Sequence, residues 1–276
     1  MTLFSYLKKK TVPAAGDDLF REISRPGPHE GPIKSIFGEC VHFEGDAPVF
    51  PRRLVLLAFT NRSGSNLMAE YMRQAGHVAG VGEFLNHDIV ERRAAEKGIT
   101  SFPAYIRELH DSLCDNGTRA LGLKASWDQI AMLLRWNITG MFPSVTIIHI
   151  IRHYVVAQSV SYGIALQTQA WTSQHESLKI EPYLSTQDVA HSMMSFYRAN
   201  LIIRLMSESF GMQRLDIGYE QILNNPQTSV PRVLQAAGLA GPKWTPRAPS
   251  LAKQGNDRNA IFVEAFYEKI RAAVTE

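Results

Sequence analysis

The sequence predicts an α/β fold in which a central parallel sheet carries helices on both faces. Short apolar runs rich in β-branched residues alternate with longer segments of helical periodicity along most of the chain. This alternation is typical of parallel sheets, because each parallel strand needs a crossover connection. The chain has 276 residues, 45% of them hydrophobic, which is sufficient for one large core. We expect this domain over residues 51–276, after a mostly irregular extension over 1–50 that is rich in Pro and Gly.

The individual elements follow from the period of the apolar residues. Strands are predicted at 54–60, 77–81, 119–124, 145–152 and 214–219, with the weakest pattern at 77–81. Helices are predicted at 65–75, 102–114, 127–136, 155–165, 186–210, 229–237 and 260–274. Thr186 provides an N-cap signal, and Gly211 and Gly238 lie where helices are expected to end.

Composition excludes several classes of protein. The net charge is only +3, and no Lys/Arg run exceeds residues 8–10, which disfavours nucleic acid as a partner. Cys40 and Cys114 lie far apart without a CxxC pattern, so neither a zinc site nor a disulfide is expected. No apolar window is long enough for a transmembrane helix, and the first residues lack a signal-peptide pattern. These features predict a cytoplasmic protein.

The turn at residues 61–66, Asn-Arg-Ser-Gly-Ser-Asn, joins the first predicted strand directly to a helix. A turn that enters a helix presents free backbone N–H groups and the positive end of the helix dipole, which favour an anion. Gly64 allows close approach of a phosphate, the Ser63 and Ser65 hydroxyls add donors, and Arg62 adds a positive charge. The alternative is a plain capped helix. Gly64 is not followed by Lys, so the turn is not a Walker loop and an ATPase or GTPase is poorly supported.

Charged side chains follow three other predicted strands at the point where each ends. They are Glu83, Lys124 and Arg152. Each alone could be a solvated surface residue, but the carboxyl ends of parallel strands meet at one edge, where such sheets bind ligands. Ser159 and Ser161 lie on the helix after Arg152, and only one of them can face the same way as Arg152. We therefore expect an anion-binding site with a candidate general base, Glu83.

Six segments in this order resemble the bacterial trehalose 2-sulfotransferase family. They are "TNRSGSNLM", "GVGEFLN", "LGLKASWDQ", "HIIRHYVVAQSVSYGIALQTQAW", "IGYEQILNNP" and "AKQGNDRN", which together cover roughly residues 52–270. The resemblance implies a P-loop-like three-layer fold over 51–276. It also implies transfer of a sulfuryl group from 3′-phosphoadenosine 5′-phosphosulfate (PAPS) to a hydroxyl of a carbohydrate or glycolipid, without a metal, and a homodimer.

The resemblance also assigns roles to individual residues. Those implied to hold the 5′-phosphosulfate are Arg62, Ser63, Gly64, Ser65 and Asn66. Arg152 and Ser161 would hold the 3′-phosphate, with Ser159 as the competing choice, and Lys253 and Gln254 would close over the nucleotide. Glu83 matches the family's general base, and Arg62 and Lys124 would stabilise charge on the transferring group. Arg62 stands where many sulfotransferases have Lys, and His153-Tyr154 replace the family's frequent Arg-Asp.

The acceptor site is the least defined part of the sequence. Segments 86–101 and 166–185 are expected to be loops that shape it, and Trp127, Gln167, Trp171 and His175 are candidates to line it, although an aromatic residue is more often core. Residues 1–50 have no counterpart in the family, so the acceptor can differ from trehalose. Two alternatives stay open: a non-catalytic protein that binds a nucleotide or a sulfated glycan, and a nucleotide kinase with a degenerate loop.

Overall fold

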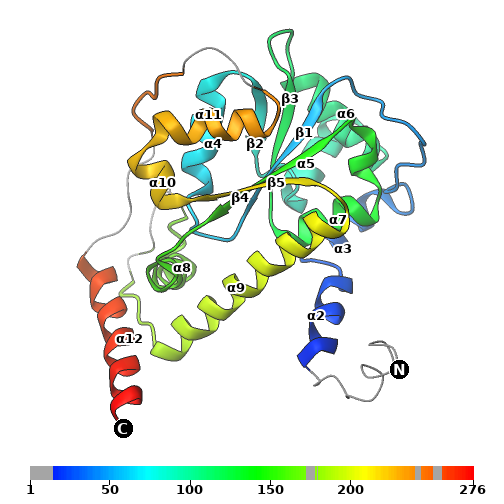
Figure 1. The fold of residues 1–276 in the computed structure, drawn as a ribbon. Coiled ribbons are helices and arrows are strands. Elements are labelled where there is room, and N and C mark those ends of the chain that lie inside the picture. The colour runs from blue at the N-terminus through cyan, green and yellow to red at the C-terminus, as the bar shows by residue number, and fades with distance from the viewer. Residues whose placement is uncertain (1–14, 172–177, 179, 240–243, 251–256) are drawn as a thin grey trace, which may run out of the picture.

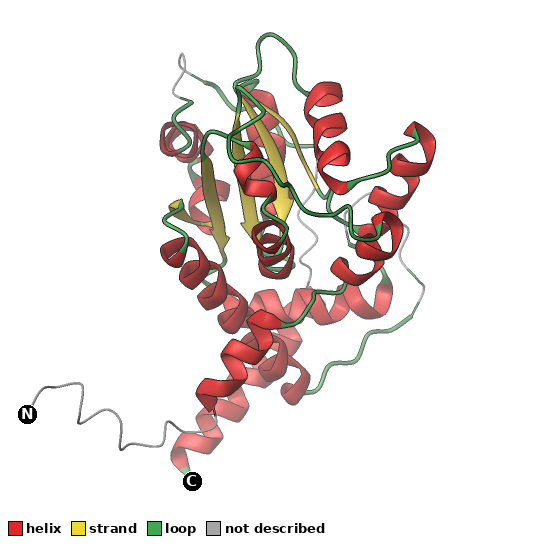
Figure 2. Ribbon diagram, turned by 90° about the vertical axis from the view of Figure 1, so that its right-hand side faces the viewer, coloured by secondary structure: helices red, strands yellow, loops and turns green. Residues whose placement is uncertain are grey.

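The computed structural model describes residues 15–171, 178, 180–239, 244–250 and 257–276, which form a parallel sheet between layers of helices (Figures 1 and 2). The strand order is β2-β3-β1-β4-β5, and every neighbouring pair is parallel. The strands are β1 (Arg53–Phe59), β2 (Val78–Gly82), β3 (Ala120–Ala125), β4 (Val145–Ile151) and β5 (Gln213–Gly218). The α/β class predicted from the sequence is confirmed, including the weak strand at 77–81.

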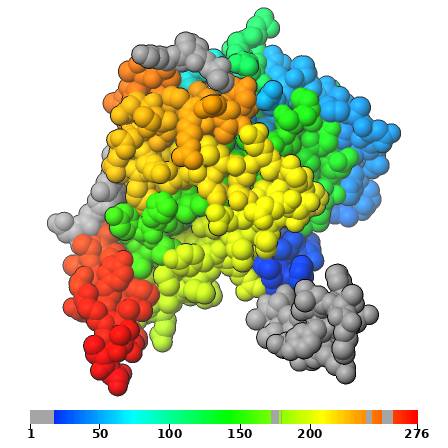
Figure 3. All heavy atoms as spheres, in the orientation of Figure 1, coloured from blue at the N-terminus to red at the C-terminus, as the bar shows by residue number. Residues whose placement is uncertain are grey.

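The helices connect these strands and cover both faces of the sheet. They are α2 (Ala15–Ser24), α3 (Glu30–Phe37), α4 (Ser65–Ala75), α5 (His87–Lys97), α6 (Phe102–Leu113), α7 (Trp127–Arg135), α8 (Val155–Thr168), α9 (Thr186–Ser209), α10 (Tyr219–Asn224), α11 (Pro226–Ala236) and α12 (Asp257–Thr275), with a 3₁₀ turn at Ile138–Met141. The C-terminal helix α12 packs against α8 and α9 through Phe266 rather than on the sheet (Figures 1 and 3).

Strand β1 lies at the centre of the sheet and is buried on both faces. Leu54 and Leu56 belong to a core shared with α3, α5, α6, α7 and α9. Val55 and Leu57 point the other way, into a core shared with α4, α10 and α11. Successive side chains of a strand alternate between faces, so a strand covered on both sides needs apolar residues throughout. This requirement explains the uninterrupted apolar run that predicted the strand.

The N-terminal segment is more regular than its Pro and Gly content predicts. Helices α2 and α3 occupy much of residues 15–50, and Ile33 and Phe37 are part of the main core. Pro32 is compatible with α3 because it lies in the first turn, where backbone N–H groups have no partner within the helix. The sequence prediction therefore missed these two helices, while residues 25–29 and 38–50 are irregular as expected.

Two further boundaries differ from the sequence prediction. Helix α5 occupies most of the segment 86–101, which was expected to be a loop, because a mainly polar helix that buries only Val90 and Ala94 shows little periodicity. Helix α11 begins at Pro226 rather than at 229, since proline is favoured at the first helical position. No helix in the described ranges is long and apolar enough to cross a membrane.

Candidate functional site

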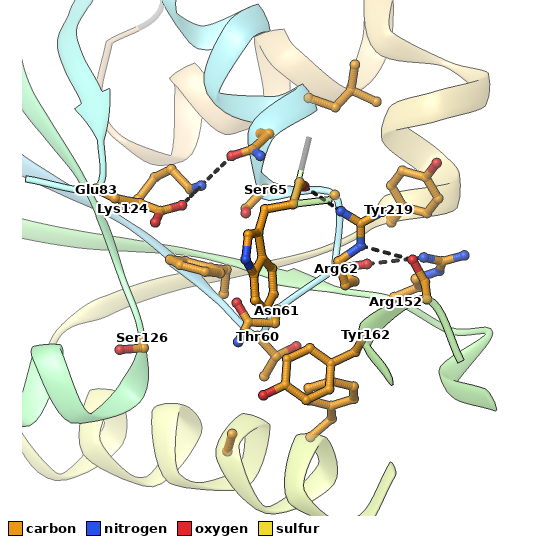
Figure 4. A pocket seen from close by; sticks show the side chains of 18 of the residues that line it. Thr60, Asn61, Arg62, Ser65, Glu83, Lys124, Ser126, Arg152, Tyr162 and Tyr219 are labelled. Carbon is orange, nitrogen blue, oxygen red and sulfur yellow. Dashed lines mark hydrogen bonds and ion pairs between the residues drawn. The ribbon is translucent and has the colours of Figure 1, made fainter. Parts of the chain in front are cut away.

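A cavity of about 970 Å³ lies at the carboxyl edge of the sheet. It is lined by the turn after β1 and by residues that follow β2, β3, β4 and β5, as the parallel topology predicts. Figure 4 shows two ends on either side of the turn. One, the carboxylate end, holds Glu83 and Lys124; the other, the arginine end, holds Arg62, Arg152 and Tyr219. Ser161 belongs to the arginine end through its hydrogen bond with Arg62.

The turn between β1 and α4 has the geometry of an anion-binding loop. Arg62 and Gly64 adopt left-handed backbone conformations, with φ of 62° and 89°. A Cβ at position 64 would lie 2.1 Å from Cδ2 of Tyr219, so both the backbone and the tyrosine ring require glycine here. Ser63 Oγ is fully buried and has no hydrogen-bond partner among the described residues. A buried hydroxyl without a partner is costly, and this one lies in the turn between Arg62 and Gly64, which line the cavity.

Gln158 holds this turn in place, a role that the sequence did not reveal. Its side-chain amide donates to Thr60 Oγ1 at 2.8 Å and to the Asn61 carbonyl at 2.8 Å. Gln158 is buried on α8, so the contact ties the turn after β1 to the helix after β4. Because Gln158 lies 98 and 97 positions from Thr60 and Asn61 in sequence, only the fold brings them together.

At the arginine end, two guanidinium groups lie close to each other. Arg62 Nε donates to Ser161 Oγ at 2.9 Å, and Arg152 Nη1 donates to the Arg62 carbonyl at 3.1 Å. Burial lowers the pKa of both arginines, and the charge of Arg152 lowers that of Arg62 further. Arg152 Nε is buried without a partner within the described residues, and its Cζ lies 5.1 Å from the Tyr219 ring centroid. An anion between these groups would relieve their mutual repulsion.

The structure distinguishes the two serines of α8. Ser161 lines the cavity and accepts from Arg62. Ser159 is 1% exposed and donates back to the Val155 carbonyl at 2.9 Å, as serines inside helices often do. Of the two candidates, Ser161 is therefore the one that faces the ligand site.

At the carboxylate end, charges are neutralised within the protein. Lys124 Nζ donates to Glu83 Oε1 at 2.5 Å and also to Asn66 Oδ1. Burial lowers the pKa of Lys124, and the Glu83 carboxylate opposes this shift. For Glu83, burial alone would raise the pKa, but the Lys124 charge and hydrogen bonds from Lys124 and Asn86 lower it below its ordinary value. Glu83 is therefore ionised at neutral pH and able to accept a proton.

A strained bulge at the end of β2 aims Glu83 into the cavity. The register with β3 shifts between Gly80 and Gly82, and Val81 between them has a φ of 52°. A β-branched residue rarely adopts this conformation, which costs on the order of 1–3 kcal/mol. Arg73 stabilises it by donating from Nη1 to the Val81 carbonyl at 2.8 Å. Without the bulge, the alternation along the strand would place Glu83 on the other face.

The other predicted site residues divide into three groups. Trp127 and Trp171 line the cavity, together with Tyr162 and Phe196, which the sequence did not single out. Gln167 does not: its side-chain amide bonds the backbone N–H and carbonyl of Tyr183, at 3.0 and 2.7 Å, so its assignment to the acceptor site is not supported. The last group, Lys253, Gln254 and His175, lies outside the described residues.

Tyr219 is the main ligand-site residue that sequence reasoning missed. It was assigned to the end of the last strand, whereas it begins α10 and packs over Gly64 and Arg152. The same argument that selects Glu83 also selects Tyr219, because Tyr219 directly follows the fifth strand at the carboxyl edge of the sheet. Within the described ranges, no group of three or more His, Cys, Asp or Glu side chains is arranged to hold a metal ion.

Comparison with known proteins gives one extensive family match. The profile of the Stf0 sulphotransferase family matches residues 54–269. The trehalose 2-sulfotransferase of Mycobacterium tuberculosis (strain ATCC 35801 / TMC 107 / Erdman) is 24% identical, over 78% of this chain and 94% of that protein. Among solved structures, the sulfotransferase domain of the Synechococcus PCC 7002 olefin synthase is 15% identical with a TM-score of 0.44, and covers 72% of this chain and 78% of its own. A sulfotransferase from Alicyclobacillus acidocaldarius is 14% identical with a TM-score of 0.44. The match covers 80% of this chain and 97% of that protein.

Proposed function

Because the chain belongs to the Stf0 sulphotransferase family and is a sulfotransferase, we propose that it transfers a sulfuryl group from PAPS to a hydroxyl of a carbohydrate, free or in a glycolipid. The observation that carries the choice of donor is the pair of buried, unpartnered donors within the described part of the site, Ser63 Oγ and Arg152 Nε. Arg152 lines the cavity, and Ser63 lies behind its wall between the lining residues Arg62 and Gly64. Two such positions would suit a ligand with two anionic groups. When bound, PAPS would supply the sulfuryl group.

The two anionic groups of the donor would occupy different parts of the site. Arg152 and Ser161 would hold the 3′-phosphate, with Tyr219 packed against the arginine. Backbone N–H groups of the turn and the Ser63 hydroxyl would hold the 5′-phosphosulfate at the N-terminus of α4. Arg62 would connect the 3′-phosphate site with the 5′-phosphosulfate site, because its side chain bonds Ser161 while its backbone is part of the turn.

Glu83 would take the proton from the acceptor hydroxyl. Its carboxylate lies in the cavity wall, is 44% exposed at the side chain and carries a lowered pKa. Lys124 has two tasks: it keeps Glu83 ionised and holds a positive charge beside Asn66, at the start of the helix that receives the phosphosulfate. The carbohydrate class is supported by the name of the Mycobacterium relative and by the polar wall around Glu83.

Ligand-dependent melting and a transfer assay test the proposal. The product 3′,5′-diphosphoadenosine (PAP), at about 100 times its Kd, should stabilise the protein by roughly 2.7 kcal/mol without Mg²⁺, and 5′-AMP at the same concentration by much less. With ³⁵S-labelled PAPS, label should move to trehalose or another sugar. Greater stabilisation by ATP with Mg²⁺ than by PAP, or no transfer to any sugar, would contradict the proposal.

A further inference from the structure

His29 lines the cavity although it lies outside the stretch that matches the family, 54–269. The segment that carries it is fixed onto α7. The next residue, Glu30, is buried and accepts from Arg135 Nε at 2.9 Å. Gly27 lies so close to α7 that a Cβ there would be 2.4 Å from Asp128 Oδ2. His29 is therefore held in the cavity wall by contacts of its neighbours with α7.

Hydrogen bonds determine which ring nitrogen of His29 carries the proton. The backbone N–H of His87 lies 3.2 Å from His29 Nδ1, and His87 Nδ1 lies 2.9 Å from the same atom. A backbone N–H can only donate, so His29 Nδ1 accepts, and in the neutral ring the proton must be on Nε2. Burial and the neighbouring His87 lower the pKa of His29, against the effect of nearby carboxylates, so the ring is neutral near pH 7.

The Nε2–H of His29 is a donor that the described part of the protein does not use. No described residue hydrogen-bonds to Nε2, and the atom is not sealed in the interior. The neighbouring amides are already engaged: Asn86 donates to Glu83 Oε2 at 3.3 Å and accepts from Gln129 Nε2 at 3.0 Å. The carboxylates of Asp88 and Asp128 also lie near His29 and line the cavity, and an ionised carboxylate accepts hydrogen bonds but cannot donate one.

We propose that His29 is an acceptor-binding residue, whose Nε2–H donates to an oxygen of a neutral, hydroxyl-rich acceptor beside the hydroxyl that Glu83 deprotonates. The inference rests on the proposed function and deepens it by naming a specificity residue from the N-terminal segment. A neutral acceptor fits because Glu83, Asp88 and Asp128 line this side, whereas the Lys124 charge is already paired.

Two substitutions at position 29 separate ligand binding from anchoring. His29→Asn keeps an oxygen near Nδ1 to accept from His87 but removes the Nε2 donor, whereas His29→Gln places an amide N–H near Nε2 and loses the Nδ1 acceptor. With saturating PAPS and the best substrate among trehalose, sucrose, glucose and N-acetylglucosamine, His29→Asn should raise the KM for the sugar about 3- to 10-fold, the size of one hydrogen bond. His29→Gln should recover most of that loss.

Two controls accompany these variants. The Kd for PAP should stay unchanged in both, since the arginine end is intact, and His42→Asn, at an exposed histidine of the same segment, should leave the KM unchanged. A KM that is normal in His29→Asn but raised in His29→Gln would assign His29 to anchoring and overturn the proposal, as would normal values in both variants. If the unaltered protein sulfates none of the sugars, the proposed function fails and this inference fails with it.

Discussion

The two ends of the cavity handle charge in opposite ways (Figure 4). At the carboxylate end, Lys124 and Glu83 neutralise each other across 2.5 Å. At the arginine end, burial lowers the pKa of Arg62, and the positive charge of Arg152 lowers it further. Arg152 Nε has no partner in the described part of the chain.

This difference indicates which ligand group belongs at each end. The Glu220 carboxylate only partly offsets the two buried guanidinium groups, whose pKa values stay lowered. An incoming anion, such as a phosphate, would stabilise them. The Glu83–Lys124 pair attracts an anion less strongly than the two arginines do, because the Glu83 carboxylate offsets the Lys124 charge, and it keeps an ionised carboxylate beside the position proposed for a neutral hydroxyl. Under the proposed function, the site would therefore distinguish the donor from the acceptor by charge.

The largest expected effect is at the carboxylate end. Glu83→Gln removes the proposed proton acceptor and should lower kcat by about 10²- to 10⁴-fold, a typical loss for a general base, while the Kd for PAP changes little. Steady-state kinetics and calorimetric titration with PAP measure the two quantities. Glu91→Gln, at an exposed position of α5, is the matched control and should have normal kcat. Normal turnover in Glu83→Gln would remove Glu83 from the mechanism.

At the arginine end, the effect should be on binding. Arg152→Ala removes a charged hydrogen-bond donor and should weaken PAP binding roughly 10- to 100-fold, but 5′-AMP binding far less, because 5′-AMP lacks the 3′-phosphate. The two Kd values can be compared by titration, with Arg232→Ala on the exposed side of α11 as control. Equal losses for both nucleotides would count against a 3′-phosphate at this end.

A pair of glycine substitutions tests the close contact between Gly64 and Tyr219 in the turn between the two ends. Gly64→Ala and Gly76→Ala both place a Cβ at positive φ, of 89° and 77°, but only position 64 would collide with Tyr219, whereas position 76 faces open space. The conformational cost common to both is about 1–2 kcal/mol. Gly64→Ala should lower Tm more than Gly76→Ala and should alone weaken PAP binding. Equal Tm values and unchanged PAP affinity would show that the Tyr219 contact is not required.

The smallest effect is the pH dependence of the Glu83–Lys124 pair. Glu83 has a pKa below its ordinary 4.5 in the folded protein. Its ionised form therefore stabilises the fold above about pH 4.5, and this contribution disappears as the pH falls through the lowered pKa. The Tm difference between the unaltered protein and Glu83→Gln should shrink from pH 6 to pH 3. The corresponding contribution to the free energy of unfolding should be about 1 kcal/mol or less, because Glu83 is partly exposed. A difference that grows toward low pH would contradict the pairing.

The sequence by itself determined the sheet and the edge at which the ligand site lies. Apolar runs are visible because buried parallel strands need apolar residues on both faces, and the residue after each run lies at the carboxyl edge by topology alone. Glu83, Lys124 and Arg152 were found in this way, and all three line the cavity. Helix α5 was hidden because it buries too few residues to show a period.

Only the tertiary structure decided which side chains meet across long separations in sequence. Tyr219 lies over Gly64, and His29 bonds His87, 58 positions away, through contacts that leave no periodic signal. The choice of Ser161 over Ser159 depends on the rotation of α8 about its axis, which packing against α9 and α12 sets. Local sequence specifies the period of an element, whereas the partner of each side chain depends on how the elements pack.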